Sequence, residues 1–277
     1  MRQIYIVDSV GSTFTFNHLT KALFTDIEGV GIDRENKYLN YDGTYKLAEK
    51  KNPIGSITGK IIFLNGYEGY TEFLNFLKNN KGDLRLFYKA DNLKYAFVEL
   101  VSLSKTELES GVLQCSIKFD KLSMWLSRLS NTIKVQESTV NKTYPYTYPY
   151  TYSISFVGSI DCVNAGCKDA PIRIEITGKT HNPVVQIINK EKEVISQMRL
   201  LVTTTNADDV IIVNAIPTEQ EMTLNVSGNI TDIYGLQDFN CDNFLNLPRG
   251  NYTIKFDPGV TETTKCKITY LEMYEGN

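Results

Sequence analysis

The chain has 277 residues, of which 42% are hydrophobic and 22% charged, and its formal net charge is −3. This length suits two domains of about 100–150 residues, and the composition is that of a folded protein. The slightly acidic balance argues against specific nucleic-acid binding, which normally needs a basic stripe. No apolar run approaches the roughly 18–20 residues that span a bilayer, and the short apolar patch before Asp8 is no signal peptide. We therefore expect synthesis in a cytoplasm and no membrane partner.

Residues 33–52 form a long polar stretch with Tyr38, Tyr41 and Tyr45 spaced through it. Residues 40–43 (NYDG) supply turn chemistry, so a protruding hairpin fits better than a core element. Exposed tyrosines give contact area at a low cost in side-chain entropy. Two interpretations stay open: a mobile surface loop, or an arm that reaches a neighbouring subunit.

The segment from 57 to 125 predicts a small antiparallel sheet with one packed helix. Strands are expected at residues 56–64, 84–89, 95–103 and 112–121, the last with its odd-numbered residues 113–119, Cys115 among them, facing inward. Thr71 is expected to cap the helix, and Phe73, Leu74, Phe76 and Leu77 to form its apolar face.

Residues 143–152 (TYPYTYPYTY) mark the clearest domain boundary. Pro145 and Pro149 lack a backbone donor and fix φ, so neither a helix nor a central strand can pass. We expect a first domain at 1–136, a linker at 137–152 and a second domain at 153–277. A covered linker and a Pro-aromatic docking motif both remain possible interpretations of this segment.

Short strands recur after this segment between turn signals. They are expected at residues 171–177, 184–188, 198–203, 210–216, 222–226, 252–256 and 266–270. Seven or more short strands at this spacing predict a β-sandwich or jelly roll. The whole chain is thus expected to be mainly β.

Catalytic and metal-binding patterns are weak throughout. The two histidines, His18 and His181, lie far in sequence from any nucleophile set, and Gly29 and Gly31 read as a turn. The five cysteines lack paired spacing; inert thiols are favoured, with zinc or a disulfide as alternatives. The acidic residues around 208–221 read as solvated turns. We predict no enzyme, no cofactor and no metal site.

His181-Asn182-Pro183 is a candidate sugar site, because sandwich domains often bind glycans. The galectin set also needs an arginine and a stacking tryptophan, and the one tryptophan, Trp125, lies in the other half. A turn before a strand is the favoured interpretation. His181 and Asn182 stay weak glycan candidates.

Several segments in order resemble the amino-terminal half of the distal tail proteins of long-tailed phages that infect Gram-positive hosts. They are residues 20–31 (TKALFTDIEGVG), 59–63 (GKIIF), 70–77 (YTEFLNFL), 84–88 (LRLFY), 104–107 (SKTE), 113–119 (LQCSIKF) and Trp125. The resemblance covers roughly residues 1–130; the second half fits the family in size and β content.

The resemblance implies a virion structural protein at the tail tip. Its first domain, an antiparallel sheet or split barrel with one helix, would form a hexameric ring, with Tyr38, Tyr41 and Tyr45 on an arm between subunits. The second domain would be a galectin-like or carbohydrate-module-like sandwich facing outward. Implied partners are the tail tube protein, the tail-associated lysin or spike, and receptor-binding or other baseplate proteins, with DNA passing through the ring. The alternative is a glycan-binding module that contacts the host cell wall through the second domain.

Overall fold

The computed structural model describes residues 2–51, 53–80, 82–137, 156–217, 219–260 and 264–277. The chain divides into two compact units. The first unit comprises Met1–Ser127 and Met273–Asn277, and the second comprises Arg128–Glu272. The structure is mainly β, as the sequence predicts, and its sheets are antiparallel throughout the described pairs.

The elements of the first unit are β1 (Gln3–Val7), β2 (Thr13–Thr15), β3 (Ala22–Glu28), β4 (Glu35–Tyr41), β5 (Thr44–Lys51), β6 (Gly55–Phe63), α1 (Tyr67–Asn79), β7 (Leu84–Lys89), β8 (Leu93–Leu103), β9 (Leu113–Lys121) and the start of β10 (Trp125–Lys134).

Seven of these strands pair in the order β2-β1-β7-β8-β9-β6-β3. The strands at its two ends, β2 and β3, are neighbours in the chain, so the sheet has to curl until its edges approach each other. Phe16 lies between them: its ring centroid is 5.3 Å from that of Phe14 on β2 and 5.2 Å from that of Phe24 on β3. This curled sheet is the split barrel expected from the sequence.

Strict alternation explains the central strand of this sheet. Leu113, Cys115, Ile117 and Phe119 of β9 are buried, whereas the residues between them are exposed or half-buried. Strands that pack one face on a core show this period of two. The inward positions predicted for β9 are confirmed.

Helix α1 packs three of the four predicted apolar residues on the core of the first unit, whereas Leu74 is not part of that core cluster. Phe73 is fully buried, and Phe76 and Leu77 pack against the same core. The predicted helix start is wrong, because α1 begins at Tyr67 and the Thr71 hydroxyl donates to the Tyr67 carbonyl from inside the helix. Gly66 and Gly69 weaken the sequence signal for a helix that begins at Tyr67, because glycine is a poor helix former.

The elements of the second unit are the rest of β10, then β11 (Gln136–Glu137), β12 (Phe156–Asn164), β13 (Ala170–Thr177), β14 (Thr180–His181), β15 (Val184–Ile188), β16 (Val194–Arg199), β17 (Thr203–Thr204), β18 (Val210–Asn214), β19 (Glu221–Val226), β20 (Asn229–Asp232), the 3₁₀ helix η1 (Tyr234–Leu236), β21 (Asn246–Leu247), β22 (Gly250–Asp257) and β23 (Lys265–Tyr274), whose last two residues belong to the first unit.

Two sheets face each other across one core in this unit. One runs β23-β13-β18-β19-β20 and the other β11-β12-β22-β15-β16. Ile172, Ile174 and Ile176 of β13 meet Ile254 and Phe256 of β22 in the shared cluster of buried residues. This is the sandwich predicted from the recurrence of short strands between turn signals. The strand predicted at 198–203 is wrong in place: β16 ends at Arg199, and β17 covers Thr203–Thr204.

The two compact units divide inside strands, and the predicted linker at 137–152 stays a prediction. The first unit ends at Ser127, inside β10, and receives residues 273–277 from the end of β23. Long strands that continue from one unit into the other leave no composition signal at the boundary. Most of the predicted linker, residues 138–152, lies outside the described residues.

Candidate assembly surface

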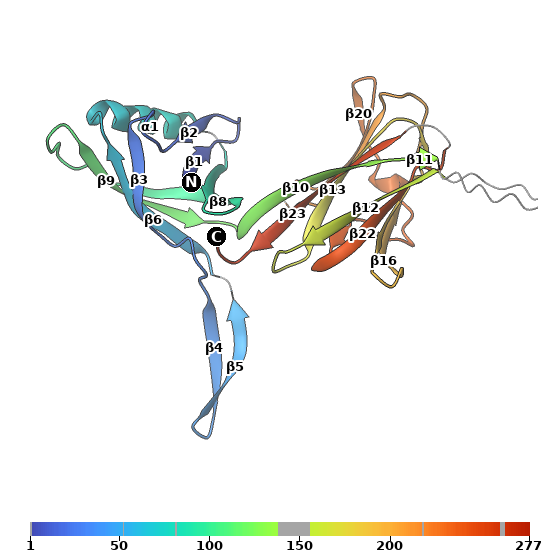
Figure 1. Ribbon diagram of the computed structural model, residues 1–277, viewed down its shortest axis with the longest axis horizontal. Coiled ribbons are helices and arrows are strands. Elements are labelled where there is room, and N and C mark those ends of the chain that lie inside the picture. Colours follow the sequence, from blue (N-terminus) through green and yellow to red (C-terminus); the bar gives the residue numbers. More distant parts are fainter. Residues whose placement is uncertain (1, 52, 81, 138–155, 218, 261–263) are drawn as a thin grey trace, which may run out of the picture. The chain divides into compact units, whose positions relative to one another are not determined.

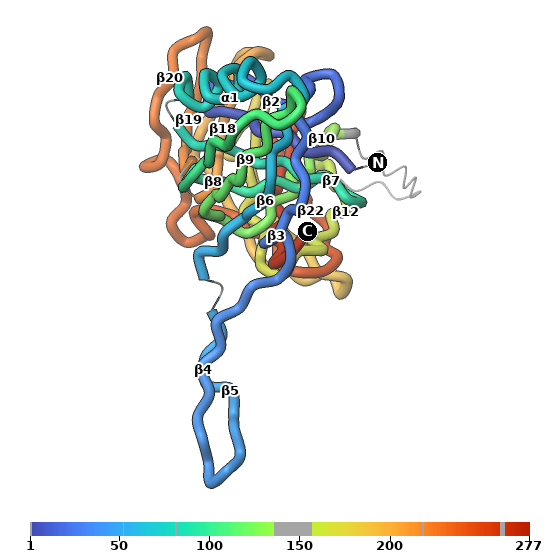
Figure 2. Tube along the Cα trace, turned by 90° about the vertical axis from the view of Figure 1, so that its left-hand side faces the viewer, coloured from blue at the N-terminus to red at the C-terminus, as the bar shows by residue number. Residues whose placement is uncertain are grey.

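A two-stranded hairpin, β4 with β5, extends from the first unit; we call it the arm (Figures 1 and 2). Its turn, Asp42-Gly43, has positive φ at both residues, 49° and 85°, and the Gly43 amide donates to Asn40 Oδ1 at 3.0 Å. An Asp-Gly pair in this conformation is the tight turn that matches strand twist. The hairpin expected from residues 40–43 is confirmed.

The arm exposes large side chains along its whole length. Tyr38 is 56% exposed, Tyr41 58% and Tyr45 70%, and Leu39 and Leu47 are also exposed. Every residue of β4 and β5 is exposed except Glu49, which is half-buried. Contiguous apolar surface on a hairpin that extends from the rest of its unit is typical of a surface that another molecule covers.

Strand pairing divides these side chains between two faces. Residues directly opposite each other in an antiparallel pair point to the same side. Tyr38 pairs with Leu47 and Asn40 with Tyr45, so Tyr38, Tyr45 and Leu47 share one face. Tyr41 and Leu39 lie on the other face, opposite Thr44 and Lys46. The three tyrosines therefore do not form one stripe, and both faces of the arm are partly apolar.

Charges run along the arm beside the tyrosines. Glu49 accepts from Lys51 at 2.8 Å and from Lys37 at 3.1 Å. Hydrogen bonds from Lys51 and Lys37 hold the pKa of Glu49 below its ordinary value. Exposed pairs of this kind contribute little stability, so they set the charge pattern of the surface more than they hold the hairpin together.

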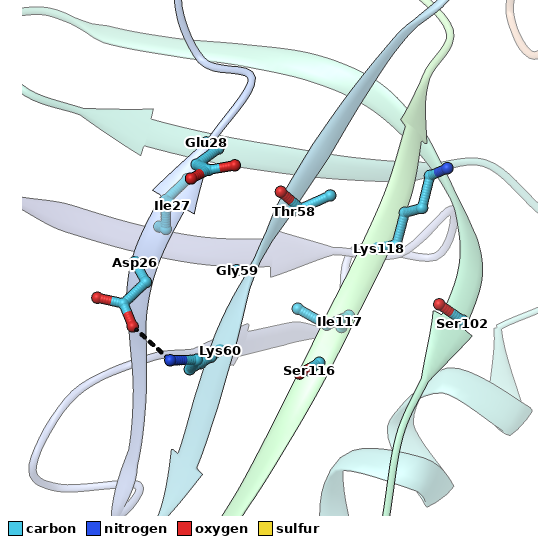
Figure 3. Close-up of a pocket in the computed structure, with 10 residues that line it drawn as sticks. All are labelled: Asp26, Ile27, Glu28, Thr58, Gly59, Lys60, Ser102, Ser116, Ile117 and Lys118. Carbon is cyan, nitrogen blue, oxygen red and sulfur yellow. Dashed lines mark ion pairs between the residues drawn. The ribbon is translucent and has the colours of Figure 1, made fainter.

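A hollow of about 740 Å³ lies over β3, β6 and β9 of the first unit. Figure 3 shows its charged side chains: Asp26 and Glu28 come from β3, Lys60 from β6 and Lys118 from β9. Asp26 and Lys60 form an ion pair at 3.1 Å. The hollow is open and carries both signs of charge without a nucleophile–base pair. Its chemistry suits a polar contact with a macromolecule better than catalysis.

A bulge in β3 shapes one wall of this hollow. The register shifts between Thr25 and Glu28, and Asp26 has φ 50°. A side chain at Gly59, on the neighbouring β6, would meet the Phe24 ring at 2.5 Å and the Thr25 carbonyl oxygen at 2.9 Å. Only glycine fits where the bulged strand approaches so closely.

The weak glycan candidates lie together on the second unit. His181 Nδ1 is 2.9 Å from Thr203 Oγ1, and Asn182 Nδ2 is 3.3 Å from His181 Nε2. Asn182 has φ 51°, which suits the turn expected there. Both nitrogens of the exposed His181 ring have polar neighbours within the protein. Their contacts therefore stabilise the turn rather than leave both nitrogens free for a sugar hydroxyl.

Two of the acidic residues around 208–221, Asp209 and Glu221, make side-chain contacts within the second unit. Asp209 is buried, and its carboxylate accepts from the Thr205 and Asn206 amides. Glu221 on β19 pairs with Arg173 on β13 at 3.1 Å, across the intervening strand β18. The expectation of solvated turns is wrong for Asp209, whose burial is made possible by these hydrogen bonds.

The five cysteines are free thiols, with Cys115, Cys162 and Cys266 buried. Within the described ranges, no group of three or more His, Cys, Asp or Glu side chains is arranged to hold a metal ion. No helix in the part of the chain that the structure describes is long and apolar enough to cross a membrane.

The sequence predicts the arm but not all of the residues that define it. Leu39 and Leu47 add apolar surface to its two faces, and Glu275 contacts Arg34 and Lys50 at its base. The two leucines could have been found from the alternation within residues 35–47. Nothing in the local sequence connects Glu275 with residues so distant along the chain.

The fold is that of a two-unit antiparallel β protein with a projecting arm, and comparisons with known proteins agree. The family profile described as "Distal tail protein, N-terminal domain" matches residues 3–122. Residues 3–122, which make up most of the first unit, are therefore similar to the amino-terminal domain of distal tail proteins.

Solved structures show the same fold along the whole chain. A chain of the phage p2 baseplate in its activated conformation has a TM-score of 0.67 at 15% identity, with 100% of each chain covered. The Dit protein of phage SPP1, described as a paradigm of hub adsorption apparatus in phages infecting Gram-positive bacteria, has a TM-score of 0.62 at 12% identity, covering 98% of this chain and 99% of that one. No curated protein matches the sequence.

Proposed function

We propose that this protein is a structural component at the distal end of a long non-contractile phage tail, without enzymatic activity. It forms a hexameric ring that connects the tail tube to the baseplate or adhesion device. The ring is built by the first unit, and tail tube, lysin or spike, and receptor-binding or other baseplate proteins attach to it. The observation that carries this proposal is the exposed, two-faced arm within a unit that matches the distal tail protein domain.

The arm supports contact between subunits for a physical reason. A two-stranded hairpin without a packed face is at best marginally stable in water. Covering Tyr38, Tyr45 and Leu47 on one side and Leu39 and Tyr41 on the other removes apolar surface from water. A ring uses the same head-to-tail contact at every subunit and closes by rotation.

Light scattering and negative-stain images of the purified protein test this proposal. The expected particle is a ring with six times the mass of the 31.4 kDa chain. Replacing Tyr38, Tyr41 and Tyr45 by Ser should weaken assembly and leave the melting temperature of the monomer unchanged, because these side chains are exposed. Leu122→Ser, at another exposed apolar side chain of the first unit, is the control. Unchanged assembly of the triple variant would contradict the role of the arm.

We infer a second candidate function, binding of host cell-wall glycan by the second unit. An exposed aromatic pair favours it: Tyr234 and Phe239 are 43% and 63% exposed, with ring centroids 6.2 Å apart. Asp238 and Asn240 lie beside them. Aromatic faces pack against sugar C–H groups, and carboxylates and amides bind hydroxyls.

Pull-down of the full chain with purified cell-wall polysaccharide tests this second function. Phe239→Ala should remove binding if the aromatic pair carries it, and His181→Ala should remove binding if the weak candidates His181 and Asn182 do. Absence of binding by the unaltered chain excludes the glycan function without affecting the ring.

A further inference from the structure

Residues 273–277 return to the first unit from the end of β23 and lie against the base of the arm. The Asn277 amide donates to the Val30 carbonyl at 3.0 Å, and Asn277 Nδ2 donates to the Tyr88 carbonyl at 3.0 Å. A Cβ at Gly276 would meet Ile32 Cγ1 at 3.1 Å. The segment is therefore packed closely on residues 30–32, which lead into the arm.

Glu275 contacts one cation beside each of the two strands at the base of the arm. Arg34, just before β4, donates from Nε to Glu275 Oε2 at 2.9 Å, and its Nη2 contacts the same oxygen. Lys50, on β5, places Nζ 3.7 Å from Glu275 Oε1. Asn36 on β4 pairs with Lys50, so these contacts bracket the base of the hairpin.

The environment of Glu275 favours its charged form. Its side chain is only 18% exposed. The hydrogen bond from Arg34 holds the pKa of Glu275 below its ordinary value against the effect of burial, and Lys50 adds to this. One carboxylate that bridges two cations in a partly shielded place constrains both strands together.

The arm itself offers little that would fix its direction. Its side chains are exposed beyond the base, and its internal ion pairs, Lys37–Glu49 and Lys51–Glu49, stay within the hairpin. At the base, the buried Lys121 lies close to Asp33 and Gly55. A hairpin held only through its two connections would swing about them.

We propose that residues 273–277 set the direction of the arm, with Glu275 as the positioning residue that joins both strands at its base. The end of the chain thereby completes the surface that the arm presents to a second copy of this chain. This last consequence rests on the proposed ring; the positioning itself is a property of the single chain.

Hydrogen–deuterium exchange of the full-length chain under monomeric conditions tests the positioning. In Glu275→Gln, amides of residues 30–36 and 50–51 should exchange roughly two- to ten-fold faster, the range expected for loss of a partly shielded ion pair. Glu49→Gln is the matched control, because it removes two lysine contacts within the arm and leaves 273–277 untouched. It should not change exchange at residues 30–34.

A double-mutant cycle makes the test specific. Arg34→Gln should also accelerate exchange, and the double variant should add little beyond Glu275→Gln, because that variant already lacks the contact with Arg34. Unchanged exchange in Glu275→Gln, or additive effects in the double variant, would overturn the proposal. Faster exchange with unchanged ring assembly would support the positioning role and refute the role of the arm in assembly.

Discussion

Replacing Phe73 by Ala should lower the free energy of unfolding of the first unit more than any substitution of an exposed residue does. Phe73 is fully buried, and its ring contacts those of Phe14, Phe16, Phe63 and Phe76 at centroid distances of 4.8, 5.7, 6.1 and 6.4 Å. Phe→Ala in a packed core costs about 3–5 kcal/mol, and the lost aromatic pairs place this site toward the upper end.

The loss is large because α1 depends on this side chain. Among the described residues of α1, Phe73 and Gly69 are the buried ones, so Phe73 is the main apolar anchor of the helix. For a unit of this size, a loss of 3–5 kcal/mol lowers the Tm by roughly 10–20 °C.

Calorimetry and urea unfolding measure this effect separately for the two units. The control is Phe239→Ala, which removes the same ring from a side chain that is 63% exposed and should change stability by less than about 0.5 kcal/mol. A loss below about 1 kcal/mol for Phe73→Ala, with unchanged urea m-value, would refute the claim that the aromatic cluster carries the helix.

Three further outcomes are expected. Gly29→Ala should destabilise the first unit by more than about 1 kcal/mol, because Gly29 has φ 80° and a Cβ would lie 1.9 Å from the Ser56 carbonyl oxygen; Gly43→Ala, with φ 85° and open space, should cost less in urea unfolding. Burial raises the pKa of Asp209, but hydrogen bonds from Asn206 and Thr205 outweigh it and lower the pKa. Its stabilisation is therefore complete above the ordinary Asp pKa and is lost as pH falls through the lowered value, so Asp209→Asn should flatten acid unfolding below about pH 4. Burial raises the pKa of Cys266 far above its ordinary value, so mass spectrometry at pH 8 should find it unalkylated in the native chain; rapid alkylation would contradict its burial.

Local periodicity predicted most of the fold because each signal needed only neighbouring residues. The alternation in β9 and β13 determined which side chains are buried, and an Asp-Gly turn was enough to predict the arm. The predicted start of the helix was wrong because Gly66 and Gly69 lower the local preference for helix. The two compact units divide inside β10 and β23, where unbroken strands carry no composition signal.

The candidate surface was predicted in part. The arm and its three tyrosines were found, but their division between two faces depends on strand register. That register shifts at a bulge between Lys37 and Tyr38, and no pattern in the sequence predicts this bulge. The contact between Arg34 and Glu275 spans 241 positions and depends on the complete fold.

The return of residues 273–277 to the first unit also bears on the order of synthesis. Residues 128–272 separate the bulk of this unit from the segment that completes it. At about 5–20 residues per second, a ribosome needs roughly 7–30 seconds to make that intervening length. During this interval the nascent arm lacks the carboxylate that joins its two strands. Association that depends on a directed arm is thereby delayed until the chain has been made through Glu275.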